Sequence, residues 1–111
     1  MSADSFLVFY GVQRRLADDE MEQCEVRKHL WMIAAQEAGL QHYWGNFSIE
    51  GDENYLLFVG RNLGIFGAEG KAELQISDAE LQSIAQDTKQ RLKEAGIAGT
   101  PTLHIQYAPD F

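Results

Sequence analysis

Apolar runs along the chain predict its strands. Residues 5 to 16 are rich in β-branched and aromatic side chains, which is typical of a strand. An alternating segment over residues 41 to 49 and an apolar run over residues 54 to 61 predict a second and a third strand. Gly51 and Asp52 lie between these two segments, and this pair suits a two-residue hairpin turn. The second and third strands should therefore be antiparallel neighbours.

Capping signals predict two helices. Acidic residues precede basic ones over residues 20 to 38, as the helix dipole favours, and Gly39 is a natural C-terminal stop. Ser77 followed by Glu80 forms a capping-box signature at the start of a second helix, over residues 78 to 95.

The remaining segments complete the order of elements. A glycine-rich connection is expected from Gly60 to Gly70, and residues 72 to 76 alternate in a way that suits a short extra strand. Pro101 introduces the last strand. Its alternating apolar and polar positions are Leu103, His104, Ile105, Gln106 and Tyr107.

The predicted order β-α-β-β-α-β resembles the split βαβ pattern of the ferredoxin-like superfold. This resemblance implies an α+β fold, a two-layer ferredoxin-like sandwich (βαββαβ). Its four-stranded antiparallel sheet would have the order 4-1-3-2, with two helices on one face. The 111 residues are then expected to form a single ferredoxin-like α+β domain, residues 1 to 111. A shared topology implies no shared function.

The two central strands are apolar on both sides. Residues 6 to 10 and 55 to 59 carry apolar or aromatic side chains at every position. Helices would cover only one face of the sheet, so the pattern predicts a second cover on the open face. This cover could be a second subunit, the glycine-rich connection or a ligand.

Alternation in the two outer strands predicts which side chains reach that open face. On the second strand, Tyr43, Phe47 and Ile49 are expected to face the helices. A two-residue turn would then place Trp44 opposite Val59 and make an apolar patch with Leu57. The predicted ligand-binding or interface residues on the open face are His42, Trp44, Asn46, Arg61, His104 and Gln106.

Three of these residues suggest a chemistry. The same register places His42 opposite Arg61, with Trp44 beside them. A guanidinium next to an indole and an imidazole can hold a small carboxylate or phosphate. Trp and Arg are also enriched in subunit interfaces, so both interpretations stay open.

Charge and the single cysteine exclude several classes. The chain has 17 acidic and 9 basic residues and a formal net charge of −8, which disfavours nucleic acid and anionic membrane surfaces as partners. Cys24 is the only cysteine, so neither an internal disulfide nor a Cys-based zinc site is expected, and a buried structural role is favoured. His42 and His104 would lie on strands roughly 14 Å apart, too far for a shared metal. We therefore expect no metal and no cofactor.

Histidine 29 and the N-terminus complete the picture. On a long helix His29 would be solvated, with Glu25 as its companion one turn earlier. The first residues lack the basic start and apolar run of a signal peptide, and no run approaches the roughly 18 apolar residues of a membrane span. A cytoplasmic location is expected.

These observations favour a small non-catalytic homodimeric module that dimerises through its open sheet face, with Trp44 near the centre, and binds a small molecule there. One alternative is a dimeric α+β-barrel enzyme, oxygenase- or isomerase-like, with a substrate cavity between two sheets. Another is a monomeric protein-interaction domain. No catalytic residue can be assigned from the sequence, so whether the protein is an enzyme stays open.

Overall fold

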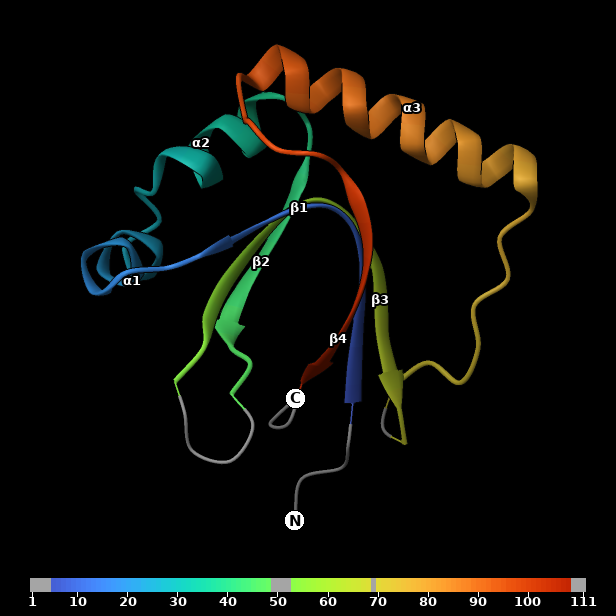
Figure 1. The fold of residues 1–111 in the computed structure, drawn as a ribbon, viewed down its shortest axis with the longest axis horizontal. Coiled ribbons are helices and arrows are strands. Elements are labelled where there is room, and N and C mark those ends of the chain that lie inside the picture. The colour runs from blue at the N-terminus through green and yellow to red at the C-terminus, as the bar shows by residue number, and fades with distance from the viewer. Residues whose placement is uncertain (1–4, 49–52, 69, 109–111) are drawn as a thin grey trace.

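The computed structural model describes residues 5–48, 53–68 and 70–108. The strands form one antiparallel sheet in the order β2-β3-β1-β4 (Figure 1). The predicted Gly51–Asp52 turn and Ile49 lie outside the described residues. The elements are β1 (Ser5–Arg15), α1 (Asp18–Glu25), α2 (Leu30–Glu37), β2 (Gln41–Asn46), β3 (Tyr55–Gly67), α3 (Asp78–Ala95) and β4 (Thr102–Ala108).

The prediction of a two-layer ferredoxin-like sandwich with two helices on one face is wrong. The described chain has three helices, because the expected helix over residues 20 to 38 is two short ones, α1 and α2. The observed strand order reads 4-1-3-2 from the opposite edge of the sheet. The sheet is an arch instead of a flat layer, with α3 across its top and α1 and α2 on its outer side (Figure 1).

The break between α1 and α2 has a local cause. Helix α1 ends at Glu25 with Val26 as its C-cap, and the next residue, Arg27, has a φ of +59°, which no right-handed helix contains. His29 then begins the second helix, because its Nδ1 accepts the backbone N–H of Trp31 at 3.1 Å. The imidazole therefore acts as the N-cap of α2.

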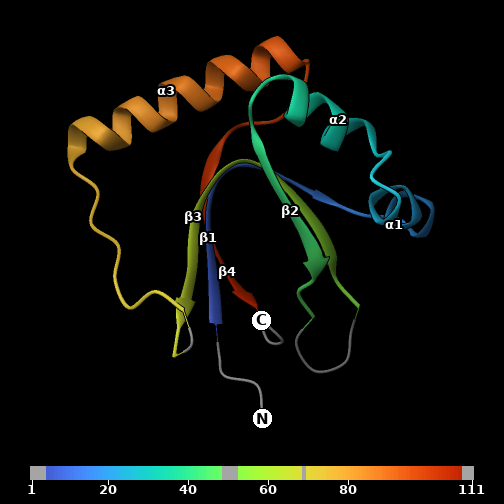
Figure 2. The ribbon, with the colours of Figure 1, turned by 180° about the vertical axis from the view of Figure 1, so that it is seen from behind.

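A pair of glycines bends the sheet. Gly11 of β1 lies directly opposite Gly60 of β3, and their φ angles are +155° and +152°. A Cβ on Gly11 would collide with the carbonyl oxygen of Val59, and one on Gly60 would collide with that of Tyr10. The two backbones therefore approach each other at a point where no side chain fits. Figure 2 shows both strands turning over at the top of the arch.

Strand β3 continues well beyond the bend. The expected glycine-rich connection from Gly60 onward is the second half of the strand, which ends at Gly67. The pairing with β1 shifts between Val8 and Phe9, where Leu63 is the extra residue of a bulge. The short strand expected over residues 72 to 76 is absent, and only an isolated bridge joins Lys71 to Phe66.

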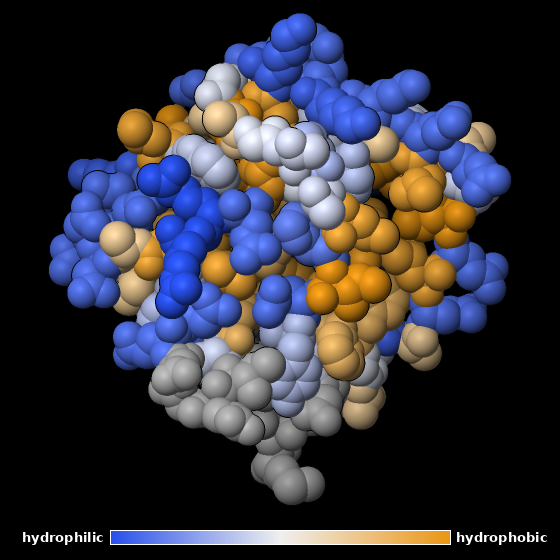
Figure 3. Space-filling view, in the orientation of Figure 1, coloured by the Kyte–Doolittle hydropathy of each residue, from blue (hydrophilic) through white to orange (hydrophobic). Residues whose placement is uncertain are grey.

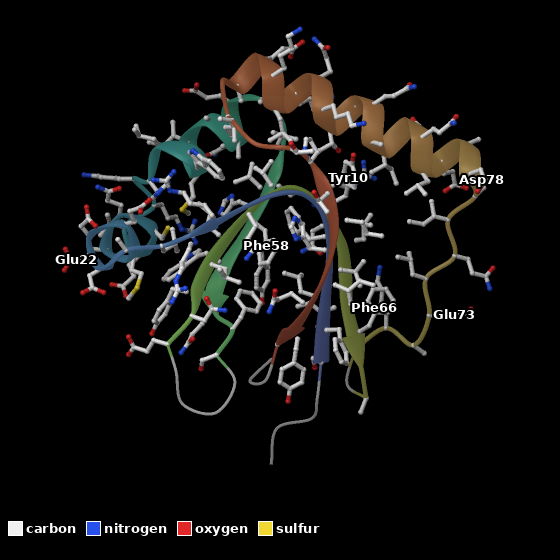
Figure 4. The ribbon with its side chains drawn as sticks, viewed as in Figure 1. Tyr10, Glu22, Phe58, Phe66, Glu73 and Asp78 are labelled. Carbon is white, nitrogen blue, oxygen red and sulfur yellow. The ribbon has the colours of Figure 1, made fainter. Side chains whose placement is uncertain are left out.

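The arch gives the sheet two separate cores. Figure 4 shows Phe58 on the inner side of the arch, between its two legs. The inner core consists of Leu7, Phe9, Phe47, Leu56, Phe58 and Ala108. The outer core, under the helices, consists of Val12, Leu16, Cys24, Met32, Ala35, Leu57, Val59, Leu92 and Ile97. Much of each face of the central strands is thus buried within one chain, because the sheet curls over its own inner face.

Helix α3 follows its prediction. The hydroxyl of Ser77 accepts the backbone N–H of Glu80 at 3.2 Å and also contacts the Glu80 carboxylate at 3.2 Å. The helix ends at Gly96 with a φ of +71°. The predicted bounds 78 to 95 are confirmed. Among the described residues, no helix has the length and apolar character needed to cross a membrane.

Candidate functional site

The six predicted site residues do not share one face. Strand β2 pairs His42 with Val59, Trp44 with Leu57 and Asn46 with Tyr55, two residues away from the predicted register. The faces of β2 are also the reverse of those expected, because Phe47 belongs to the inner core and Tyr43 packs against it. His42, Trp44, Asn46 and Arg61 are therefore on the outer face, with Leu57 and Val59, whereas His104 and Gln106 are on the inner face, with Phe9 and Leu7.

Trp44 does not lie on an open apolar surface. It is half-buried against the outer core, and its neighbours Leu57 and Val59 are 0% exposed. The patch that the sequence predicted from these three residues is covered by the protein's own helices. Trp44 is thus a packing residue, and the expectation of a dimer centred on it loses its basis.

His104 supports the bend from inside. Its Nε2 donates a hydrogen bond to the carbonyl of Gly11 at 3.2 Å, and its ring packs edge-on against Phe58 at 5.4 Å. Gln106 follows on the same face and is half-buried. The interior of the arch beside His104 is occupied by side chains such as Phe9 and Phe58, which are both fully buried.

Asn46 and His42, the other two predicted site residues on β2, also do not form the predicted ligand site. The Asn46 side-chain oxygen accepts the backbone N–H groups of Ser48 and Asn54, both at 3.1 Å, and so orders the ends of the β2–β3 connection. Partial burial and the nearby Arg27 charge lower the pKa of His42. Both effects disfavour the positively charged imidazolium that an anion site would use.

Arg61 lines a hollow that the sequence analysis missed. This Arg61 hollow has a volume of about 340 Å³ and is lined by Gly39, Leu40, Gln41, Gly60, Arg61, Asp87, Thr88 and Arg91. The α2–β2 turn, the bend of β3 and the middle of α3 contribute these residues. Neither His42 nor Trp44 belongs to it. The sequence signal for its helical wall is the spacing of Asp87 and Arg91, one turn apart on α3.

A second polar group joins β1, α1 and α2. His29 is only 3% exposed, and its Nε2 lies 2.9 Å from Glu20, so the expectation of a solvated side chain next to Glu25 is wrong. Glu20 also accepts a hydrogen bond from Arg14 Nε at 2.6 Å. These hydrogen bonds, from Arg14 first and then His29, lower the pKa of Glu20 to about 2. The carboxylate is thus held ionised by structural partners.

This group does not offer a free acid or base. His29 uses Nδ1 to cap α2 and Nε2 to reach Glu20, so both ring nitrogens have protein partners. Because Nδ1 accepts, the proton of the neutral ring is on Nε2 and is donated to Glu20. The guanidinium of Arg14 lies 5.3 Å from the centre of the Trp31 ring, a cation–π contact that fixes it further. The group is a structural link.

Cys24 is not a reactive thiol. It is 1% exposed within the outer core, and burial, followed by the charge of Glu20, raises its pKa. A nucleophilic cysteine needs the opposite shift. The prediction of a buried structural cysteine is confirmed. In the described ranges, no three His, Cys, Asp or Glu side chains are grouped so that they could hold a metal ion.

Edge strand β4 exposes the second candidate surface. Phe6, Leu103 and Ile105 are 43%, 48% and 68% exposed. The pairing of β1 with β4 places Leu103 opposite Tyr10 and Ile105 opposite Val8, so the three exposed side chains lie on the outer face of adjacent strands. We call these three residues the β4 patch. Figure 3 shows apolar side chains gathered below α3, on the half of the molecule that contains these strands.

Comparison with models of known families, with curated proteins and with solved structures finds no significant match. No activity, ligand or partner therefore comes to this chain from a relative.

Proposed function

We propose that this protein is a non-catalytic module that forms a homodimer through the outer edge of β4. The observation that carries the proposal is Ile105, an isoleucine 68% exposed on an edge strand. Edge strands of monomeric proteins are commonly protected by charged side chains, prolines or bulges. The seven residues Thr102–Ala108 contain no Asp, Glu, Lys, Arg or Pro.

A second copy of the chain suits this edge better than an unrelated partner does. The edge of an antiparallel strand can pair with itself about a two-fold axis, so each β4 would supply the donors and acceptors that the other needs. The chain carries a net charge of −8, and like charges would repel each other across most pairs of surfaces. At β4 that repulsion is reduced, because the strand itself has no Asp, Glu, Lys or Arg.

The size of the surface sets how such a dimer must be held. A stable interface buries roughly 800 Å² on each partner, and an exposed apolar patch of a monomer seldom exceeds a few hundred Å². The β4 patch alone is too small for this, since it consists of three partly exposed side chains. Main-chain pairing along the seven residues of β4 would contribute the rest and would join two four-stranded sheets into one of eight strands.

The two alternatives receive less support. A barrel enzyme needs a cavity against the sheet, but Phe9 and Phe58 fill the inner face and His104 is bonded to Gly11. A monomeric interaction domain would use the same β4 edge for a different protein. It differs from the proposal in solution mass, which makes the two separable.

Light scattering over a range of concentrations tests the proposal. We expect a mass approaching twice the monomer value of 12.5 kDa, and Ile105→Lys should return it to the monomer value. Val26→Lys is the matched control, since Val26 is 62% exposed but lies at the end of α1. A monomer mass at every concentration, or a dimer unaffected by Ile105→Lys, would overturn the proposal.

A further inference from the structure

The wall of the Arg61 hollow contains a guanidinium that is already fixed in place. Arg91 Nε donates to both carboxylate oxygens of Asp87, at 3.0 and 3.1 Å, and Nη1 donates to the carbonyl of Ala38 at 2.9 Å. Three protein oxygens thus set the plane and direction of the group. Its Nη2 has no protein partner within the described ranges.

Gly39 makes this arrangement possible. It has a φ of +73° in the turn between α2 and β2, and a Cβ there would lie 2.5 Å from Arg91 Nη1. A larger residue would push the guanidinium away from the Ala38 carbonyl. The turn and the helix are therefore shaped to hold this arginine at the hollow.

Arg61 adds a second cation that is not neutralised. It follows Gly60 at the bend, it is exposed, and no acid within the described ranges lies within 4 Å of its nitrogens. Asp87 also lines the hollow, but its charge is matched by Arg91. Glu80 lines a second hollow that shares Arg61 and Asp87 with the first, and its carboxylate contacts the Ser77 hydroxyl. With Arg91 and Asp87 balanced, the hollow keeps one positive charge in a chain of net charge −8.

Thr88 supplies a neutral donor between the two arginines. The residue is only 2% exposed and lines the hollow. In the described part of the chain the Thr88 hydroxyl makes no hydrogen bond. Every side-chain polar atom there that is completely enclosed by protein does have a hydrogen-bond partner. The hydroxyl oxygen is therefore not fully enclosed by protein, although the residue as a whole is only 2% exposed. Since the hollow is the open space that Thr88 lines, the hydroxyl is available to a molecule bound there.

We propose that the Arg61 hollow binds a small oxyanion, a carboxylate or a phosphoryl group. A guanidinium can donate to two oxygens of such a group at once. Charge-assisted hydrogen bonds of this kind are stronger than hydrogen bonds between neutral groups. Arg91 would donate from Nη2, and because its side chain is already held in place, binding would cost little further side-chain entropy. Arg61 would close over the ligand, and Thr88 would donate a hydrogen bond from its hydroxyl. This site lies apart from the β4 patch and does not depend on dimer formation.

Amide NMR titration at constant ionic strength tests this inference, with inorganic phosphate and acetate as the two probes. We expect saturable shifts centred on Gly39, Gly60 and Thr88, and the probe that binds more tightly identifies the phosphoryl or carboxylate class. Arg61→Gln should raise the dissociation constant at least about tenfold, because it removes a charged donor pair. Arg61 has no partner within the described ranges, so this variant should fold normally.

Arg15→Gln is the matched control, because Arg15 is exposed at the end of β1, away from the hollow. It should leave both dissociation constants unchanged. Thr88→Ser keeps the hydroxyl and should bind as the parent does. Concentrations up to about 20 mM are needed to detect binding of millimolar affinity. The absence of a saturable shift with either probe over this range would overturn the inference. Equal responses of the parent and Arg61→Gln would overturn it as well.

Discussion

Gly11 and Gly60 lie opposite each other, and each occupies the space that a side chain on the other would need. A Cβ on Gly11 would lie 2.9 Å from the Gly60 Cα, and a Cβ on Gly60 would lie 2.8 Å from the Gly11 Cα. The collisions involve backbone atoms, which no rotamer change can relieve. The bend of the arch thus depends on both residues.

Gly11→Ala and Gly60→Ala should each destabilise the protein by about 3 kcal/mol or more, because a positive φ and a backbone collision add together. Gly96→Ala is the control. Gly96 also has a positive φ of +71°, but a Cβ there would meet nothing within 4 Å, so its cost should be about 1 kcal/mol. Urea unfolding monitored by tryptophan fluorescence gives the three values. Similar costs at all three positions would argue against a steric bend.

Ser77→Ala should lower the free energy of unfolding by about 1 kcal/mol, because it removes the N-cap of α3. Ser83→Ala provides the comparison, since Ser83 is exposed in the same helix and should change stability by less than about 0.5 kcal/mol. Denaturant midpoints of the two variants are the measurement. Equal midpoints would mean that the Ser77 hydroxyl does not cap the helix in solution.

Glu20 should make stability depend on pH below neutrality. Its folded pKa of about 2 is below its ordinary value of 4.5, so the stabilisation is complete above about pH 4.5 and is lost as the pH falls towards 2. At pH 7, Glu20→Gln should cost on the order of 1 to 3 kcal/mol, since Arg14 is partly solvent-screened. Unfolding titrations at several pH values should show this cost shrinking in acid. Glu22→Gln, an exposed neighbour on α1, should show no such trend.

Cys24 should react with a thiol reagent at least about 100-fold more slowly in the native protein than in urea, because reaction requires opening of the outer core. Its raised pKa slows the reaction further at neutral pH. A Cys24→Ala, Ser83→Cys protein gives the rate for an exposed thiol on the same scaffold. Rapid labelling of native Cys24 would contradict its placement in the core.

Local signals predicted helix α3 correctly, but they did not predict the break between α1 and α2 or the arch of the sheet. The Ser77 cap and the Gly96 stop are read within a few residues, and both are confirmed. The bend depends on Gly11 and Gly60, which meet only after β1 and β3 have paired. A glycine inside a strand indicates close backbone approach, but the sequence does not say which other backbone approaches it.

The faces of β2 were ambiguous for a similar reason. Tyr43 and Trp44 are adjacent aromatic residues, so either face of the strand could have been the buried one. The register was predicted separately, from an assumed two-residue turn, and the observed pairing of Asn46 with Tyr55 differs from it by two residues. The Arg61 hollow was missed because its parts come from β3, α3 and the α2–β2 turn, which only the tertiary fold brings together.

The central position of β1 has a consequence for synthesis of the protein. Its partners are β3 and β4, and Ser5 pairs with Ala108 near the other end of the described chain. Of the described strands, β1 is made before β3 and β4, so its pairing is complete only when β4 has been made. Contacts so distant in sequence slow folding, and during that delay Leu7 and Phe9 have no inner core to enter. The inner core can therefore close only after β4 has been made.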